Sequence, residues 1–312
     1  MDLVKELLNG SRLGLARAIT AVENGYDNAK DIMRQIYPHT GKAKILGITG
    51  APGAGKSTLT DKIVKAYRRR GLKVGIVAVD PTSPFSGGAI LGDRIRMNDL
   101  ALDEGVFIRS MGTRGSLGGL SKKTTDAVKL MDAFGMDVII IETVGVGQSE
   151  VDIVKSADTT LVVLVPGLGD DIQAIKAGIL EIGDVFAINK ADRDGADRLN
   201  VEIEMMLDLD SKKVDWRPPI LRTVASRDEG VEELVVSLEE HFDFLQKTGK
   251  LEVRREQRIR NEILTMIHEE IARVVREEVT ETPGFDSKVS DVHNKKEDPY
   301  TVVDSVMQSV IK

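Results

Sequence analysis

The sequence contains no cysteine among its 312 residues, and histidine and aromatic residues are also scarce. Without cysteine the chain can form neither disulfides nor thiolate metal sites, although its redox compartment is left open. Its histidines do not stand at the short spacing of paired metal ligands, so a metal site built on them is not expected. Because aromatic residues are only 4% of the chain, the core must consist mainly of Ile, Val, Leu, Met and Ala. The four histidines are His39, His241, His268 and His293.

Long hydrophobic runs and an excess of positive charge are missing as well. No apolar run approaches the roughly 20 residues that span a bilayer. The first residues, Met1 to Glu6, mix both charges and do not resemble a secretory signal. The formal net charge is −7, which argues against a nucleic-acid partner. We therefore expect a cytoplasmic protein that binds neither membrane nor nucleic acid.

The order of the predicted elements divides the chain into three parts. Residues 1–41 carry apolar residues at helical spacing, and Ser11 is a plausible N-cap within this N-terminal helical segment. Residues 42–246 alternate short Val- and Ile-rich runs with helical segments, which is typical of a doubly wound, mostly parallel α/β sheet covered on both faces. The predicted strands are 45–49, 74–79, 106–109, 138–141, 161–165, 185–188 and 220–224.

Residues 247–312 lack the strand pattern and form the third part. Apolar residues recur every three or four positions over 252–279, which predicts a long amphipathic helix. This helix could pack against its own domain or serve as a dimerisation arm. Thr282-Pro283-Gly284 predicts a break, and a last short helix is expected to start at Asp298-Pro299.

The segment from Gly50 to Ser57 reads G-x-x-x-x-G-K-S and lies between a predicted strand and a predicted helix. That context is typical of a phosphate-binding loop, in which glycines let backbone N–H groups face phosphate oxygens. The helix N-terminus adds a favourable dipole. Lys56 is expected to reach the β- and γ-phosphates, and the Ser57 hydroxyl to ligate Mg²⁺. The predicted phosphate-binding residues are Gly50, Ala51, Pro52, Gly53, Ala54, Gly55, Lys56, Ser57 and Thr58.

Asn189-Lys190-Ala191-Asp192 has the form N-K-x-D and follows a late predicted strand. The Asp192 carboxylate can accept hydrogen bonds from N1–H and the 2-amino group of guanine, whereas adenine offers neither donor there. Asn189 would hold the base edge and the neighbouring loop, and the Lys190 stem would cover the base face. Ala225 and Ser226, after the last predicted strand, are the expected second contact with the base. The motif therefore favours GTP and GDP over adenine nucleotides.

The predicted strand 138–141 ends next to Glu142, with Gly145 three residues further on. A carboxylate at this place holds Mg²⁺ directly or through water, and the glycine amide can meet the γ-phosphate. Many GTPases place a water-orienting glutamine directly after that glycine, but this chain has Val146 there and Gln148 two positions later. We therefore expect slow intrinsic hydrolysis, in which Gln148 or a partner group orders the water.

Two aspartates complete the predicted metal and catalytic set. Asp80 ends the predicted strand 74–79, and Asp93 lies in Gly92-Asp93-Arg94. Both could lie near the metal in a nucleotide-sensing loop, although Asp93 could instead be an N-cap. The glycine-rich stretch 111–121 is open to three interpretations: a second anion site, a partner-docking loop or a plain connection. The expected catalytic residues are Lys56, Asp80, Asp93, Glu142 and Gln148, and the expected metal ligands are Ser57, Asp80, Asp93 and Glu142.

Taken in order, these motifs resemble the MeaB/ArgK family of P-loop GTPases. The resemblance is carried by GAPGAGKST, VAVDPTSP, LGDRIRM, TRGSLGGLS, IETVGVGQSE, NKAD and DPYT, which begin at positions 50, 77, 91, 113, 141, 189 and 298. It implies a SIMIBI-class G domain at 42–246, with homodimerisation through the C-terminal arm. It also implies a chaperone of adenosylcobalamin-dependent methylmalonyl-CoA mutase that gates cofactor delivery and protects the enzyme. Residues 169–178, with Lys176, would be a third switch that senses the mutase.

Three other functions are weighed against this one. A metal-insertion GTPase of the same class would need soft ligands, which this chain lacks. Relatives have also been described as kinases of an amino-acid transport system, but no residue here indicates a site that phosphorylates a protein. A scaffold that binds GTP without turnover is the third alternative.

Overall fold

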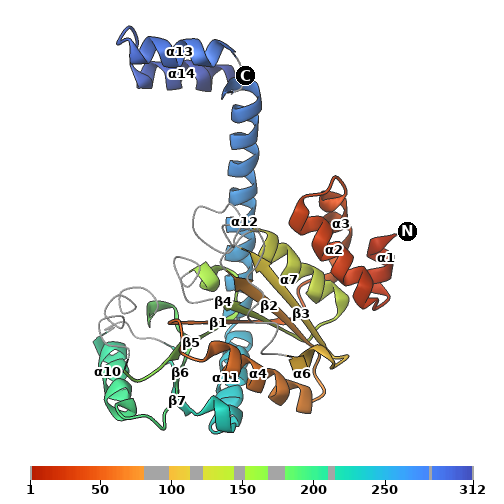
Figure 1. The fold of residues 1–312 in the computed structure, drawn as a ribbon, viewed down its shortest axis with the longest axis vertical. Coiled ribbons are helices and arrows are strands. Elements are labelled where there is room, and N and C mark those ends of the chain that lie inside the picture. The colour runs from red at the N-terminus through yellow and green to blue at the C-terminus, as the bar shows by residue number, and fades with distance from the viewer. Residues whose placement is uncertain are drawn as a thin grey trace. The chain divides into compact units, whose positions relative to one another are not determined.

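A seven-stranded parallel sheet forms the centre of the first part of the chain (Figure 1). The computed structural model describes residues 2–80, 98–112, 122–143, 152–167, 180–209, 215–280 and 283–310. The strand order is β3-β2-β4-β1-β5-β6-β7, and every neighbouring pair is parallel. The predicted fold class and all seven predicted strands are confirmed. The strands are β1 Lys44–Gly50, β2 Val74–Asp80, β3 Val106–Gly112, β4 Val138–Thr143, β5 Thr159–Leu164, β6 Val185–Asn189 and β7 Ile220–Thr223.

The central strands are apolar on both faces because helices cover both faces. Alternate residues of β4 belong to different cores: Val138 and Ile140 pack on one side, and Ile139 and Ile141 on the other. All four are at most 1% exposed. This explains why these strands appear in the sequence as continuous apolar runs without polar alternation.

Two helices, α4 (Lys56–Arg69) and α11 (Val231–Lys247), pack together over one face. On the other face α7 (Lys122–Phe134) lies against the sheet, and α1 (Leu3–Leu8), α2 (Arg12–Asn24) and α3 (Ala29–Ile36) pack on α7 (Figure 1). The remaining elements of this part are α6 Asn98–Ala101, α10 Ala196–Leu209, and the short 3-10 helices η1 Tyr37–His39, η2 Ile153–Lys155, η3 Leu180–Ile182 and η4 Ala225–Arg227.

Side-chain hydrogen bonds cap α2 and hold the chain segment that precedes β1. The Ser11 hydroxyl accepts a hydrogen bond from the N–H of Gly14 at 3.1 Å, which confirms the predicted N-cap of α2. The buried Asp132 carboxylate accepts backbone N–H groups of Gly41, Lys42 and Ala43. The chain is thereby fixed to α7 just before it enters β1.

Residues Glu252–Lys312 form a second compact unit, separate from Met1–Leu251. The predicted long helix is α12 (Lys250–Val275), which is followed by a π-helical turn, Arg276–Thr280. The predicted break at 282–284 agrees with the end of the π-helical turn at Thr280, but the sequence did not predict the further helix α13 (Pro283–His293) that starts there. Proline is tolerated at the first helical position, where its missing N–H has no helical partner. The last helix, α14 (Pro299–Val310), is capped by Asp298, which accepts the N–H groups of Tyr300 and Thr301.

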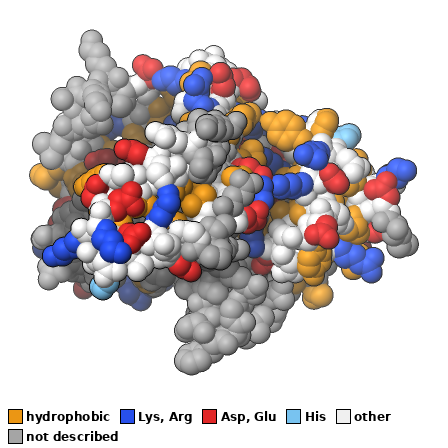
Figure 2. All heavy atoms as spheres, turned by 90° about the horizontal axis from the view of Figure 1, so that it is seen from above, with side chains coloured by type: hydrophobic (Ala, Val, Ile, Leu, Met, Phe, Trp, Pro, Cys, Tyr) orange, Lys and Arg blue, Asp and Glu red, His pale blue; other side chains and the backbone are white. Residues whose placement is uncertain are grey.

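The three-part division made from the sequence stays a prediction. Within the described ranges, no helix combines the length and the apolar character needed to cross a bilayer. Figure 2 shows a face on which Lys and Arg side chains are interspersed with Asp and Glu side chains.

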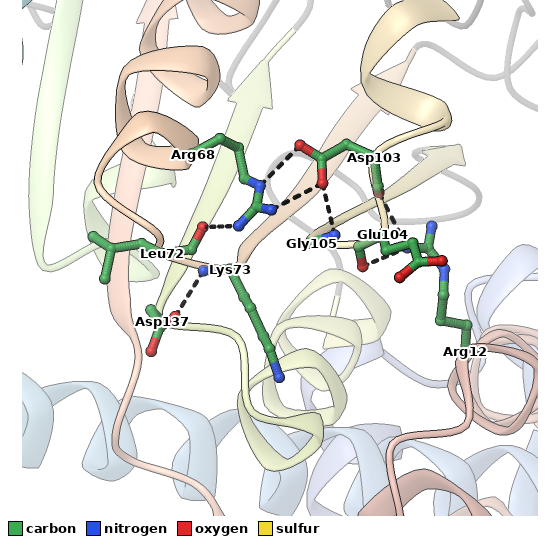
Figure 3. A network of polar contacts seen from close by, with 8 residues as sticks. All are labelled: Arg12, Arg68, Leu72, Lys73, Asp103, Glu104, Gly105 and Asp137. Atoms are coloured by element: carbon green, nitrogen blue, oxygen red, sulfur yellow. Dashed lines mark hydrogen bonds and ion pairs between the residues drawn. The ribbon is translucent and has the colours of Figure 1, made fainter.

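A polar network joins three elements at the amino ends of β2 and β3 (Figure 3). Arg68, near the end of α4, binds both oxygens of Asp103 at 2.9 and 3.0 Å, and also the carbonyl of Leu72 at 2.7 Å. Arg12 of α2 donates to the carbonyls of Asp103 and Glu104 at 3.2 and 2.7 Å. A Cβ at Gly105 would lie 2.1 Å from the Arg68 guanidinium carbon, so a larger residue there would displace the guanidinium. The phosphate-loop helix is thus fixed to the segment between α6 and β3.

Replacing Asp103 with asparagine is expected to lower the free energy of unfolding by about 0.5–1 kcal/mol at pH 7, because the pair is partly exposed. The hydrogen bond from Arg68, together with the Gly105 N–H and nearby arginine charge, lowers the pKa of Asp103, although partial burial of the carboxyl acts in the opposite direction. A lowered pKa stabilises the fold when the carboxylate is ionised, and this stabilisation disappears as pH falls through the folded-state pKa.

The free energies of unfolding of the wild-type and Asp103→Asn proteins, measured in urea, should therefore converge in acid. Asp208→Asn, at a more exposed ion pair with Arg217, is the matched control and should change stability less. A constant difference at every pH would contradict this account.

Candidate functional site

The phosphate loop joins β1 to α4 through residues 50–55. Gly50, Gly53 and Gly55 adopt φ values of 140°, 74° and 87°, which side chains rarely tolerate. A Cβ at Gly50 would lie 2.1 Å from the carbonyl oxygen of Val163 in β5, and a Cβ at Gly55 would lie 2.5 Å from the Asn189 amide nitrogen. The backbone of the loop therefore lies directly against β5 and against Asn189.

Lys56 is the first residue of α4, and its side chain is only 6% exposed. Its ammonium donates to the carbonyls of Gly50 at 2.7 Å and Ala51 at 3.0 Å. The positive charge consequently lies against the loop itself, where it can reach the oxygens of a phosphate held by that loop.

Ser57 and Glu142 are brought together from α4 and β4, as the predicted metal site requires. The Ser57 hydroxyl donates to Glu142 Oε1 at 2.6 Å, and Glu142 is only 4% exposed. Hydroxyl and carboxylate oxygens are the ligands that Mg²⁺ prefers. These two side chains therefore fit the role of holding Mg²⁺ beside phosphate oxygens.

The other predicted metal and catalytic residues are only partly described. Asp80 is the last residue of β2, whose neighbour in the sheet is β4. Its position at the same end of the sheet as Glu142 agrees with the prediction, but its side chain is outside the described set. Asp93, Gly145 and Gln148 lie outside the described residues, as do the 113–121 part of the glycine-rich stretch and Lys176, so their roles stay predictions.

The predicted base loop begins at Asn189, the last residue of β6, and is fastened on two sides. The Asn189 amide donates to the carbonyl of Ala54 at 2.8 Å, and its oxygen accepts the Thr223 hydroxyl at 3.2 Å and the Ala225 N–H at 3.1 Å. Lys190 adopts a left-handed φ of 55° and donates to the carbonyl of Gly53 at 2.7 Å. Base loop and phosphate loop are thereby held at a fixed separation.

Asp192 is partly exposed, and its carboxylate pairs with the guanidinium of Arg227 at 3.4 Å. Ser226, the other predicted base contact, lies beside Arg227 in η4. The sequence interpretation missed Arg227 and its partner Glu229. The available signal was weak: charged residues follow Ser226 directly, but surface loops commonly carry such charges.

The arrangement follows from the parallel sheet. Gly50, Glu142, Asn189 and Thr223 are the last or next-to-last residues of β1, β4, β6 and β7, so they lie at the carboxyl edge of one sheet. The strand order reverses at β1, and ligands of such sheets bind at this crevice. The site can hold a nucleotide by its phosphates and read the edge of its base.

Several known proteins are similar to this chain. The family model for "Methylmalonyl Co-A mutase-associated GTPase MeaB" matches residues 15–280. A Pyrococcus horikoshii protein named "Putative GTPase" is 54% identical over 313 residues. The match covers 99% of this chain and 98% of that protein. GTPase ArgK of Escherichia coli is 40% identical over 266 residues, covering 82% of this chain and 80% of its own.

Two further relatives carry more specific names. The mitochondrial methylmalonic aciduria type A homolog of Caenorhabditis elegans is 35% identical over 291 residues, covering 87% of this chain and 73% of its own. A crystal structure described as a LAO/AO transport system kinase superposes with a TM-score of 0.74 at 28% identity, covering 100% of this chain and 97% of that one.

Proposed function

Because the chain belongs to the MeaB family of P-loop GTPases, we propose that it is a Mg²⁺-dependent GTP hydrolase that acts as a chaperone of an adenosylcobalamin-dependent acyl-CoA mutase. Methylmalonyl-CoA mutase is the proposed client. In this role the chaperone gates cofactor delivery and protects the client enzyme, and its affinity for the client changes with the bound nucleotide.

The observation that carries the GTPase part is the junction at Asn189, which connects the base loop to Ala54 of the phosphate loop and to Ala225 of the second base contact. These contacts support a site in which the proposed phosphate loop and base loop act together. The mutase part is supported by the family description and by the name of the Caenorhabditis elegans relative.

Lys56 and the loop N–H groups hold the β- and γ-phosphates and stabilise the charge that develops on them as the γ-phosphoryl group transfers to water. Ser57 and Glu142 would hold Mg²⁺, which neutralises charge on the β- and γ-phosphates when bound. Asp80, Asp93 and Gln148 are proposed to orient the metal's waters and the attacking water. Asn189, Lys190 and Asp192 are proposed to orient guanine.

Switching is proposed to reside in segments that contact the γ-phosphate and relax when it leaves. These segments are 80–97 and 142–150, with 169–178 as a third segment that responds to the mutase. Arg68 and Asp103 fix the chain shortly after the first of these segments to the phosphate-loop helix.

The second unit is proposed to form a homodimer. Ile259, Ile263, Ile267 and Ile271 follow one another at four-residue spacing along α12, and each is between 42 and 49% exposed. A stripe of this kind on a charged helix suits helix–helix association.

GTP turnover by the purified protein alone is expected to be slow, on the order of 10⁻³ to 10⁻² s⁻¹, because the position after Gly145 is Val146 and no glutamine stands there. The proposed client should accelerate it. Phosphate release from GTP is measured with and without the host's adenosylcobalamin-dependent mutase, and with ATP as the control nucleotide. Rapid turnover without the mutase, or equal hydrolysis of ATP, would contradict the proposal.

The kinase name of the structural relative supplies a second candidate function. Labelled γ-phosphate separates the two, since a kinase transfers the label to an acceptor and a hydrolase releases it as inorganic phosphate. Membership of a family of GTPases favours release.

A further inference from the structure

The loop that follows β7 is closed on itself. Val224 and Glu229 exchange backbone hydrogen bonds of 3.0 and 3.3 Å. Asp228 adopts a left-handed φ of 61°, and a Cβ at Gly230 would lie 2.1 Å from the carbonyl oxygen of Arg222. These constraints define the backbone conformation of residues 224–229, and they thereby fix the positions from which its side chains extend.

Two side chains of this loop pair with each other. The Arg227 Nε lies 2.7 Å from Glu229 Oε1, and a terminal nitrogen lies 3.3 Å from Oε2. This two-point contact fixes the plane of the guanidinium, as is usual for arginine and carboxylate. The second terminal nitrogen of Arg227 remains available, and it lies 3.4 Å from Oδ2 of Asp192.

The β7–η4 segment thus supports Asn189 and Asp192 of the base loop. Asn189 is held by Thr223 and Ala225, and the Asp192 carboxylate is bonded to Arg227. Among the side-chain contacts of the described residues, this ion pair is the one that Asp192 makes. The Asp192 side chain is 40% exposed, so packing alone does not fix its rotation.

We propose that Arg227, itself held by Glu229, is a positioning residue that orients the Asp192 carboxylate for two hydrogen bonds to guanine, an inference that rests on the proposed function. Guanine presents N1–H and the 2-amino group side by side, and both carboxylate oxygens must face them together. Arg227 contacts Oδ2, which has a second lone pair for guanine, and leaves Oδ1 to the other donor. Arg227 therefore contributes to guanine selectivity without touching the base.

Binding of inosine diphosphate tests the positioning role of Arg227, because the base of this nucleotide lacks the 2-amino group and offers Asp192 a single donor. Dissociation constants for GDP and for inosine diphosphate are measured by calorimetry on the full chain. Arg227→Ala is expected to weaken the binding of GDP about three- to fivefold, which is the range of a partly exposed ion pair. It should weaken the binding of inosine diphosphate less. Glu229→Gln should act in the same direction, and Arg227→Lys should restore part of the selectivity. Arg198→Ala, which removes an exposed pair with Glu202 on α10, is the matched control and should change neither constant.

Equal weakening of both nucleotides would mean that Arg227 only stabilises the loop, and tighter GDP binding would mean that it competes with guanine. Either result overturns the inference. Asp192→Ala separates this inference from the proposed base site. If Asp192→Ala leaves GDP affinity unchanged, the base site itself is wrong. If it weakens GDP while Arg227→Ala changes nothing, only the positioning role fails.

Discussion

Replacing Lys56 with alanine is expected to lower GTP turnover at least about a hundredfold, because single groups that stabilise developing charge contribute on this scale. The ammonium lies inside the phosphate loop, against the carbonyls of Gly50 and Ala51. No other described cation donates to these two carbonyls. Turnover is measured as phosphate release at saturating GTP and Mg²⁺.

Lys65→Ala is the matched control, since Lys65 lies on the same helix and pairs with Asp61 near the surface. It should leave turnover unchanged. Lys56→Arg keeps the charge, and melting curves of all three variants report whether the fold is intact. A folded Lys56→Ala protein with wild-type turnover would show that the phosphates bind elsewhere.

Replacing Asp192 with asparagine is expected to weaken the binding of GTP about ten- to hundredfold. The amide oxygen accepts a hydrogen bond from one guanine donor, but the amide N–H₂ group then faces the other donor. Xanthosine triphosphate carries a carbonyl at C2, which can accept a hydrogen bond from the new amide. Its affinity should therefore rise in the same variant. Competition binding with GTP, xanthosine triphosphate and ATP measures the exchange of preference.

Asp194→Asn, two residues further along the same exposed loop, controls for the loss of one negative charge. It should leave the order of nucleotide affinities as in the wild type. If Asp192→Asn weakens GTP binding without strengthening xanthosine triphosphate binding, residue 192 does not contact the C2 substituent of the base. If it loses neither, guanine is held by other residues.

Much of the fold could be predicted because its determinants are local. The strands of the sheet are Val- and Ile-rich runs buried on both faces, and the run 138–141 makes up most of β4. The meeting of Ser57 and Glu142, 85 residues apart, also followed from a local rule, since parallel strands bring their carboxyl ends to one edge.

The features that the sequence did not predict depend on context beyond the motif. Helix α13 was missed because Pro283-Gly284 predicts a break when the residues that follow are not considered. The Arg227–Asp192 pair joins residues 35 positions apart, and Arg227 lies in a loop that the Val224–Glu229 bridge closes. Arg68 and Asp103 are likewise joined across α4 and the start of β3, and no motif marks either residue.

We propose above that the bound nucleotide sets the affinity of this protein for an adenosylcobalamin-dependent mutase. The most direct test is the dissociation constant for the purified mutase, measured with the protein loaded with GDP and with a non-hydrolysable GTP analogue. A coupling of 1–3 kcal/mol, typical of linked binding sites, corresponds to a difference of about 5- to 150-fold. The account predicts a difference in that range, and Lys56→Ala should remove it. Equal affinity in both nucleotide states, or no binding to the mutase in either, would contradict it.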